Sequence, residues 1–131
     1  MKRIIPVLLL LSLALTGCAA SAPDPQVHTY RQITMQEAVA IMEKEENAVI
    51  LDVRTEQEYA AGHIPGAIVI PNETIGTQEI PQLPDKDQLI MIYCRSGNRS
   101  KQAADKLVKL GYINIIEFGG ISSWPGEIVT D

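Results

Sequence analysis

Residues 89–110 have the sequence LIMIY-CRSGNRS-KQAADKLVKL, which contains the clearest strand, loop and helix signals of the chain. The apolar run 89–93 predicts a strand buried on both faces, and the apolar residues at helical spacing in 100–110 predict an amphipathic helix. Between them lies the polar loop Cys94-Arg95-Ser96-Gly97-Asn98-Arg99-Ser100. Such turns and helix N-termini favour an anion, because successive backbone N–H groups point out of them. The nearest candidate anion is the cysteine thiolate, and the two arginines of the loop add positive charge.

The same alternation of short apolar runs and helical patterns continues on both sides of this stretch. Strands are expected at residues 30–33, 48–51, 68–70, 89–93 and 113–118, and helices at residues 35–45, 55–61, 100–110 and 121–124. Thr34 with Glu37 and Thr55 with Glu58 have the spacing of capping boxes, and residues 72–88 are expected to form a loop over the core. The pattern predicts an α/β fold, a five-stranded parallel sheet flanked by helices on both faces. Ligands of such sheets bind beyond the carboxyl ends of the strands, where the loop cysteine is placed.

Length and composition indicate one globular domain with a real core. The chain has 131 residues, of which 46% are hydrophobic and 21% are charged. The net charge of −5 argues against general nucleic-acid binding, so no nucleic-acid partner is expected. Against this acidic background, Arg95 and Arg99 form a local cationic site.

The first 17 residues predict an export signal. Lys2 and Arg3 precede the apolar run 4–15, which is shorter than the ~20 residues that a membrane-spanning helix needs. The run ends in Leu15-Thr16-Gly17-Cys18, which resembles the lipobox of bacterial lipoproteins. The resemblance implies cleavage before Cys18, a diacylglycerol on its sulfur and acylation of its new amino group. Several acyl chains together anchor a protein firmly to a membrane. An ordinary cleaved signal with a chance cysteine is the alternative.

This interpretation divides the chain into three parts. Residues 1–17 are the lipoprotein signal peptide, residues 18–29 are the lipidated cysteine with a proline-bearing tether, and residues 30–131 are the folded domain. The mature protein, with a net charge of −7 after loss of two basic residues, is expected outside the cytoplasm, held on the bacterial cell membrane by lipid on Cys18. Cys94 is then the only thiol, so its chemistry has no internal resolving cysteine.

Residues 32–124 resemble a single rhodanese domain. The matching features, in the order of the family, are Leu51-Asp52-Val53-Arg54, Glu58, Gly62-His63-Ile64-Pro65-Gly66-Ala67, Tyr93-Cys94-Arg95-Ser96-Gly97-Asn98-Arg99-Ser100, Gly119-Gly120 and Trp124. The resemblance implies a sulfurtransferase in which Cys94 takes a sulfane sulfur from a donor such as thiosulfate or a persulfide. The resulting persulfide passes its sulfur to a thiol or to cyanide. The family implies no metal and no organic cofactor, and we expect a monomer.

The residues of the loop suit this chemistry. The attacking species is the thiolate, and a helix N-terminus with nearby cations lowers the pKa of a cysteine. Backbone N–H groups of residues 95–100 would stabilise the charged terminal sulfur, Gly97 would let the loop curl, and Ser96 and Ser100 offer hydroxyl donors. One of the two loop arginines would hold the anionic part of the donor, and the sequence leaves open which one.

Four other residues are expected to support the site. Asp52 and Arg54 are interpreted as a charge-assisted pair that braces the sheet edge. His63 is interpreted as a hydrogen-bonded turn residue, and Trp124 as a packing anchor or a wall of the pocket. A cysteine after a buried strand is otherwise an inert core residue, but the polar, basic loop favours function here.

Three other functions compete with this one. Phosphatases and arsenate reductases of related fold use a cysteine loop one residue longer that ends in an arginine, whereas the corresponding position here is Ser100. A loop sized for a sulfur atom is too tight for a tetrahedral oxyanion. A non-catalytic binding module is a second alternative, although such domains commonly lack the cysteine. A sulfur carrier that serves one protein partner at the membrane is the third.

Overall fold

The computed structural model describes Gly17 and residues 29–131. The predicted lipid site Cys18 and most of the predicted signal and tether lie outside these residues. The elements are β1 (Arg31–Gln32), α1 (Met35–Lys44), β2 (Val49–Asp52), α2 (Glu56–Ala61), β3 (Ile68–Val69), η1 (Asn72–Thr74), β4 (Ile90–Cys94), α3 (Asn98–Lys109), β5 (Ile115–Gly120) and η2 (Ile121–Ser123). None of the helices in the described residues has the length and apolar character needed to cross a membrane.

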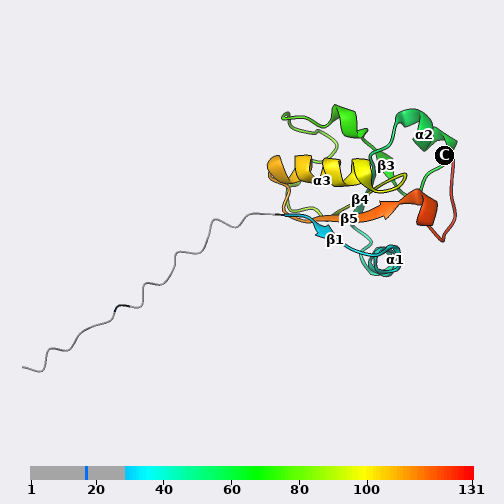
Figure 1. Ribbon diagram of the computed structural model, residues 1–131, viewed down its shortest axis with the longest axis horizontal. Coiled ribbons are helices and arrows are strands. Elements are labelled where there is room, and N and C mark those ends of the chain that lie inside the picture. The colour runs from blue at the N-terminus through cyan, green and yellow to red at the C-terminus, as the bar shows by residue number, and fades with distance from the viewer. Residues whose placement is uncertain (1–16, 18–28) are drawn as a thin grey trace, which may run out of the picture.

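The strands form one five-stranded sheet in the order β1-β5-β4-β2-β3, with every neighbouring pair parallel. α1 lies on one face of the sheet and α3 on the other (Figure 1). The predicted α/β fold, with a parallel sheet covered on both faces, is therefore confirmed. The central strand β4 is buried along its whole length and ends at Cys94, so the cysteine lies at the carboxyl edge of the sheet.

Two apolar cores fill the space between the sheet and its helices. Side chains alternate along β4, so Ile92 faces the α3 side and Tyr93 faces the α1 side. The segment 72–88 contains only the single turn η1, and its apolar side chains cover the α3-side core, as expected. The buried members of this segment are Ile75, Ile80 and Leu83.

Both predicted capping boxes are present. In each, the N-cap threonine accepts from the backbone of the glutamate three residues later, and that glutamate accepts from the N-cap backbone; the pairs are Thr34 with Glu37 and Thr55 with Glu58. α3 instead begins at Asn98, two residues earlier than the helical periodicity indicates. Gly97 is its N-cap in the left-handed region, with φ 112° and ψ −13°. A non-glycine residue adopts this conformation only with strain, so Gly97 is what allows the loop to turn directly into the helix.

The end of β5 differs from the sequence interpretation. The strand continues through Gly120, whereas the expectation was a strand to residue 118 followed by a glycine turn. Gly120 pairs with Cys94 across the sheet, and a Cβ built on it would overlap the carbonyl group of Arg95. The glycine is therefore required for a close approach of two backbones, because β5 passes directly against the start of the cysteine loop.

Candidate active site

The thiol of Cys94 lies inside the loop that follows β4. Cys94 is 1% exposed and is not in a disulfide. Its Sγ accepts a hydrogen bond from the backbone N–H of Gly97 at 3.0 Å and lies 3.4 Å from the Oγ of Ser100. The register of β4 against β5 shifts between Ile92 and Cys94, so the cysteine ends the ladder at an irregularity. The sulfur therefore sits where a parallel strand, a tight loop and a helix N-terminus meet.

Burial and hydrogen bonding act in opposite directions on this thiol. Burial raises the pKa of Cys94, whereas hydrogen bonds from the Ser100 hydroxyl and from backbone N–H groups of Ser100, Gly97 and Ser96 lower it. The hydrogen bonds outweigh burial, so the pKa lies below that of a free cysteine. A larger fraction of the sulfur is then thiolate, which is the nucleophilic form.

A buried glutamate on β5 lies near this cysteine, on the other side of Ser100, and the sequence analysis assigned it no role. Glu117 of β5 is 3% exposed. Its Oε1 accepts from the Ser100 hydroxyl at 2.6 Å and from the backbone N–H of Gly119 at 2.8 Å. The signal in the sequence is a single carboxylate inside the apolar run 113–118. Burying a carboxylate costs free energy unless hydrogen bonds or a charged partner compensate it, so such a residue has a specific role.

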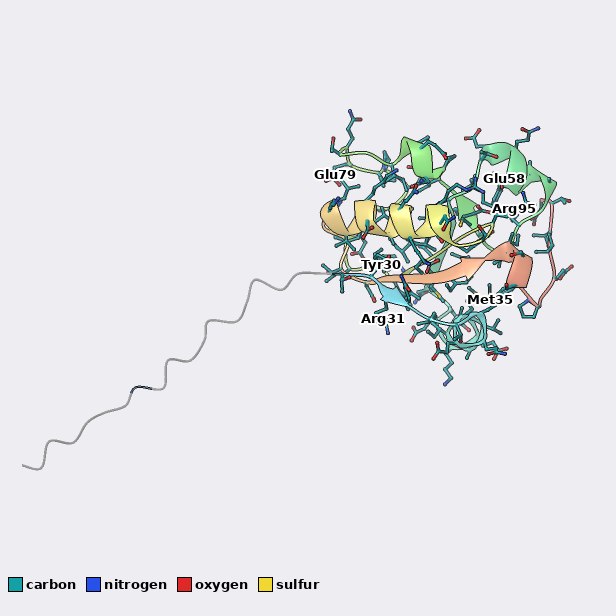
Figure 2. The ribbon with its side chains drawn as sticks, in the orientation of Figure 1. Tyr30, Arg31, Met35, Glu58, Glu79 and Arg95 are labelled. Carbon is teal, nitrogen blue, oxygen red and sulfur yellow. The ribbon has the colours of Figure 1, made fainter. Side chains whose placement is uncertain are left out.

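The two arginines of the loop have different environments. Arg99 makes a bidentate ion pair with Glu58 of α2, with Nη1–Oε1 at 2.7 Å and Nη2–Oε2 at 3.0 Å. The hydrogen bond from Arg99 is the main reason that the pKa of Glu58 falls to about 2. Arg95 is exposed, and within the described residues its guanidinium makes no hydrogen bond or salt bridge, although its carbonyl accepts from Ser122 Oγ at 3.0 Å. Figure 2 shows Arg95 and Glu58 at the same end of the molecule.

The remaining loop residues form the rim. Ser96 and Asn98 are exposed, and neither side chain makes a hydrogen bond to the sulfur. Gly97 and Ser100 are buried beneath them. The loop therefore has an inner layer of donors around Cys94 and an outer layer of polar groups that an incoming ligand meets first.

Comparison with known proteins agrees with this geometry. The sequence profile of the rhodanese-like domain matches residues 34–127. The chain belongs to the rhodanese-like family. The thiosulfate sulfurtransferase GlpE of Pseudomonas entomophila is 35% identical over 103 residues, which cover 75% of this chain and 91% of that protein. A sulfurtransferase of Allochromatium vinosum is 42% identical over 82 residues, which cover 60% of this chain and 73% of that protein.

Solved rhodanese structures share the fold. The rhodanese-like domain of an Anabaena protein superposes with a TM-score of 0.69 at 26% identity and covers 79% of this chain and 81% of that chain. A rhodanese from E. coli, solved with anions, has a TM-score of 0.58 at 30% identity and covers 64% of this chain and 99% of that chain. A human single-domain sulfurtransferase has a TM-score of 0.63 at 25% identity and covers 71% and 93%.

In this rhodanese-like domain Asp52 and Arg54 form the expected pair. Arg54 Nε lies 3.0 Å from both carboxylate oxygens, and its Nη2 donates to Asp52 Oδ2 at 2.7 Å and to the carbonyl of Gly62 at 2.6 Å. Burial lowers the pKa of Arg54, but its bonds and charge contacts with Asp52 raise it more, so the net direction is upward. The pair joins the end of β2 to the end of α2, and it contributes no atom to the surroundings of the sulfur.

His63 and Trp124 are also structural in their contacts. The ring of His63 is stacked on Tyr59 with centroids 3.7 Å apart, and its Nδ1 lies 2.8 Å from the Tyr59 carbonyl oxygen. Its Nε2 lies 3.2 Å from Asp131 Oδ1, which holds the C-terminal residues against the turn near α2 (Figure 1). Trp124 packs on the α1-side core and donates from Nε1 to the Glu127 carbonyl at 3.0 Å. The structure thus places both as turn and packing residues.

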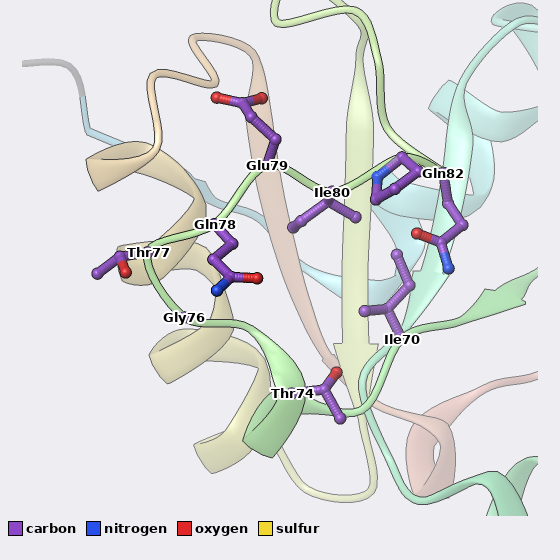
Figure 3. A pocket seen from close by; sticks show the side chains of 9 residues that line it. Ile70, Thr74, Gly76, Thr77, Gln78, Glu79, Ile80 and Gln82 are labelled. Carbon is purple, nitrogen blue, oxygen red and sulfur yellow. The ribbon is translucent and has the colours of Figure 1, made fainter.

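A cavity of the rhodanese-like domain lies away from the cysteine (Figure 3). It measures about 390 Å³ and is lined by Ile70, Thr74 and residues 76–82. Gly76 and Thr77 also line a neighbouring hollow with Lys106, Lys109 and Leu110, which places the cavity near the C-terminal end of α3. Cys94 lies beyond the other end of this 12-residue helix, which is about 18 Å long. Figure 2 likewise shows Glu79 and Arg95 at opposite ends, so we place the chemistry in the loop.

The described part of the chain contains no cluster of three or more histidine, cysteine or acidic side chains that could hold a metal ion.

Proposed function

We propose that this protein is a sulfurtransferase that carries a sulfane sulfur on Cys94. The observation that carries the proposal is the buried thiol that accepts the Gly97 N–H at 3.0 Å at the start of α3, with a lowered pKa. Membership of the rhodanese-like family and the printed names of two relatives, a thiosulfate sulfurtransferase and a sulfurtransferase, support it.

The reaction has two displacement steps. With thiosulfate as donor, the Cys94 thiolate attacks the sulfane sulfur, a new S–S bond forms, and the bond to the sulfonate sulfur breaks. Sulfite leaves with the electron pair, and the negative charge remains on the outer sulfur of the persulfide. An acceptor thiolate or cyanide then attacks that outer sulfur and releases the Cys94 thiolate. Backbone N–H groups of the loop would stabilise the charged outer sulfur, since fixed donors in a buried site need no reorganisation.

Arg95 is the residue that would bind the anionic part of the donor. Arg99 is already engaged by Glu58, whereas the Arg95 guanidinium is exposed at the mouth of the loop. A guanidinium can bind a sulfonate through two parallel N–H donors. The similar rhodanese from E. coli was solved with anions, which is in keeping with an anionic donor. The role of Arg99 is then to hold α3 against α2.

The structure disfavours the phosphatase alternative. Ser100 stands where the longer loop has an arginine, and its hydroxyl is 2.6 Å from the buried Glu117 carboxylate. A phosphate group bound around the sulfur would face this carboxylate, and like charges in a buried site repel each other strongly.

The test is direct loading of sulfur. The full chain carrying Cys18→Ser, in which Cys94 is the only thiol, is incubated with thiosulfate and its intact mass is measured. We expect a gain of one sulfur atom that cyanide or a small thiol removes. Cys94→Ser in the same background should gain none. No gain with thiosulfate, polysulfide or an organic persulfide, or an equal gain on the Cys94→Ser chain, would contradict the proposal. A gain that only one partner protein removes would indicate a dedicated sulfur carrier.

We also propose that Cys18 carries lipid and that this lipid anchors the domain to the membrane outside the cytoplasm. The anchored protein is proposed to be a monomer. The support is the sequence Leu15-Thr16-Gly17-Cys18 after a basic start and an apolar run. Expression in a bacterium with labelled palmitate should label the wild-type chain in the membrane fraction, and Cys18→Ala should abolish the label. Labelling that persists in Cys18→Ala would contradict the anchor.

A further inference from the structure

Three buried groups form a continuous line from the sulfur into the sheet. Cys94 ends β4, Ser100 lies in the first turn of α3, and Glu117 lies in β5. The Cys94 thiol lies 3.4 Å from Ser100 Oγ, and Ser100 Oγ lies 2.6 Å from Glu117 Oε1. All three are nearly or completely inaccessible to solvent. Water therefore does not separate the thiol from the carboxylate; a single hydroxyl does.

The hydroxyl of Ser100 has one proton, so it can donate to only one neighbour at a time. Its contact with Glu117 Oε1 at 2.6 Å is shorter than its contact with the Gly97 carbonyl oxygen at 3.0 Å, so it donates to the carboxylate and accepts from the neutral thiol of Cys94. The other donor to this carboxylate oxygen is the backbone N–H of Gly119, and no salt bridge within residues 29–131 includes Glu117. The carboxylate is therefore held by neutral donors alone.

We propose that Cys94 and Glu117 share one proton through Ser100. The S–H bond of Cys94 breaks as its proton bonds to Ser100 Oγ, and the original Ser100 O–H bond breaks as that proton bonds to Glu117 Oε1. One proton leaves the sulfur, one arrives on the carboxylate, and no electrons change hands. Afterwards Ser100 donates to the thiolate and neutral Glu117 donates to Ser100.

This exchange supplies the base that the loop lacks. It deepens the proposed sulfurtransferase function and rests on Cys94 reacting as a thiolate. The hydrogen bond from the Ser100 hydroxyl that lowers the pKa of Cys94 reaches the sulfur only when the carboxylate has taken the proton, whereas the bond from the Gly97 N–H is present in both states. Glu117 does not contact the sulfur of the substrate. It acts as a positioning residue, because its protonation determines whether the Ser100 hydroxyl can donate to the thiolate.

The surroundings contain few other charges that could obscure this coupling. Among the described residues, the guanidinium groups nearest in the chain are those of Arg95 on the rim and Arg99, whose pKa is raised first by Glu58 and also by the charge of Cys94. On β1, uncharged Gln32 is in register with Glu117. The face of α3 that packs against the sheet is apolar there, with Ala103, Ala104 and Leu107 buried.

The expected coupling is large enough to measure. The sulfur and the carboxylate oxygen are no more than about 6 Å apart through Ser100. When two groups hold a proton about equally, repulsion between their charges at that distance, at an effective dielectric constant of about 20, separates the two deprotonation steps of the pair by about two pH units. Such steps belong to the pair and appear in both groups at the same pH values.

The test measures thiolate reactivity without any sulfur donor. In the full chain with Cys18→Ser, the rate of alkylation of Cys94 by iodoacetamide is followed from acidic to alkaline pH. We expect two rises separated by a plateau, and a single rise in Glu117→Gln, whose amide cannot take the proton. Glu43→Gln, the same change at an exposed position on α1, should keep both rises. A single rise in the parent chain, or two rises that persist in Glu117→Gln, would overturn the proposal.

A reciprocal measurement covers the case in which Glu117→Gln does not fold. The side-chain carboxyl signal of Glu117 is followed by carbon NMR against pH in the parent chain and in Cys94→Ser. We expect two steps in the parent chain, at the same pH values as the two rises in alkylation, and one step in Cys94→Ser. Identical profiles in the two chains would overturn the shared proton. Neither measurement uses thiosulfate, so a failure of sulfur loading would reject the proposed function and leave this result independent.

Discussion

Two buried carboxylates near the carboxyl edge of the sheet have partners of different kinds. Asp52 ends β2, is 0% exposed, and is held by the guanidinium and the backbone N–H of Arg54. Glu117 in β5 is 3% exposed and is held by the Ser100 hydroxyl and a backbone N–H. One carboxylate faces a full positive charge, whereas the other faces only dipoles.

The difference decides what each carboxylate can do. Adding a proton to Asp52 would leave the buried guanidinium of Arg54 without its counter-charge, which is costly in a low-dielectric interior. Adding a proton to Glu117 strands no cation, because its partners are neutral. The same side-chain chemistry therefore gives a brace in one place and a proton acceptor in the other, and the partner, rather than the depth of burial, distinguishes them.

The largest expected effect comes from breaking the brace. Asp52→Ala should lower the free energy of unfolding by about 3–5 kcal/mol, since it leaves Arg54 buried and unpaired. Chemical denaturation measures this loss. The double variant Asp52→Leu with Arg54→Met should be more stable than Asp52→Ala alone, because neither charge is then left buried. A double variant as unstable as the single one would mean that the packing of β2, and not the charge pair, carries the stability.

The next effect sharpens the other side of the comparison. Ser100→Ala removes the group between thiol and carboxylate, and a hydrogen bond to a charged group contributes about 1.5–3 kcal/mol. We expect kcat/KM for sulfur transfer from thiosulfate to fall about 10- to 100-fold. Ser123→Ala, at an exposed position in η2, is the matched control and should keep the parent rate. Equal rates in Ser100→Ala and Ser123→Ala would remove Ser100 from the mechanism.

The two loop arginines repeat the contrast between a paired and an unpaired charge. Arg95→Ala should raise KM for thiosulfate about fivefold, the equivalent of ~1 kcal/mol for an exposed charge contact, with little change in kcat. Steady-state kinetics with thiosulfate measures this split, and Arg31→Ala, at an exposed position on β1, is the control. If KM depended instead on Arg99 while Arg95→Ala left it unchanged, the assignment of the anion-binding arginine would be reversed.

The smallest expected effect concerns the Arg99 pair. Glu58 has its pKa lowered by Arg99 from 4.5 to about 2, so the pair contributes stability above about pH 4.5 that is lost as the pH falls toward 2. Both side chains are partly exposed, so the contribution should be below about 1 kcal/mol. Urea denaturation of the parent chain and of Glu58→Gln should therefore differ above that range and converge below it. A difference that stays constant down to pH 2 would contradict the shift.

Much of this arrangement could be predicted from the sequence because its signals are local. A buried strand, a glycine-containing loop and an amphipathic helix follow one another within 89–110, and the capping boxes at Thr34 and Thr55 each use residues three apart. Cys94 is the last residue of the strand, so its place at the carboxyl edge of a parallel sheet follows from the order of the elements alone.

The residues that were missed act over long separations in the chain. Glu117 meets Ser100 only because β5 lies beside β4 and because its side chain falls on the α3 face. Periodicity in a strand buried on both faces does not reveal which face a residue occupies. The pairing of Arg99 with Glu58 joins residues 41 positions apart, so the sequence could not decide which arginine was free.

The parallel sheet also sets a direction for the molecule. The described domain begins beside β1, where Arg31 is in register with Ile116, and Cys94 is in register with Gly120 further along the same strand. At about 3.3 Å per residue, the sulfur lies about 13 Å beyond the point of chain entry. If lipid on Cys18 anchors the chain, as proposed, the attachment is at the rear and the reactive loop is at the front. A soluble donor or a second protein would then reach the sulfur at the end of the domain opposite the point of chain entry.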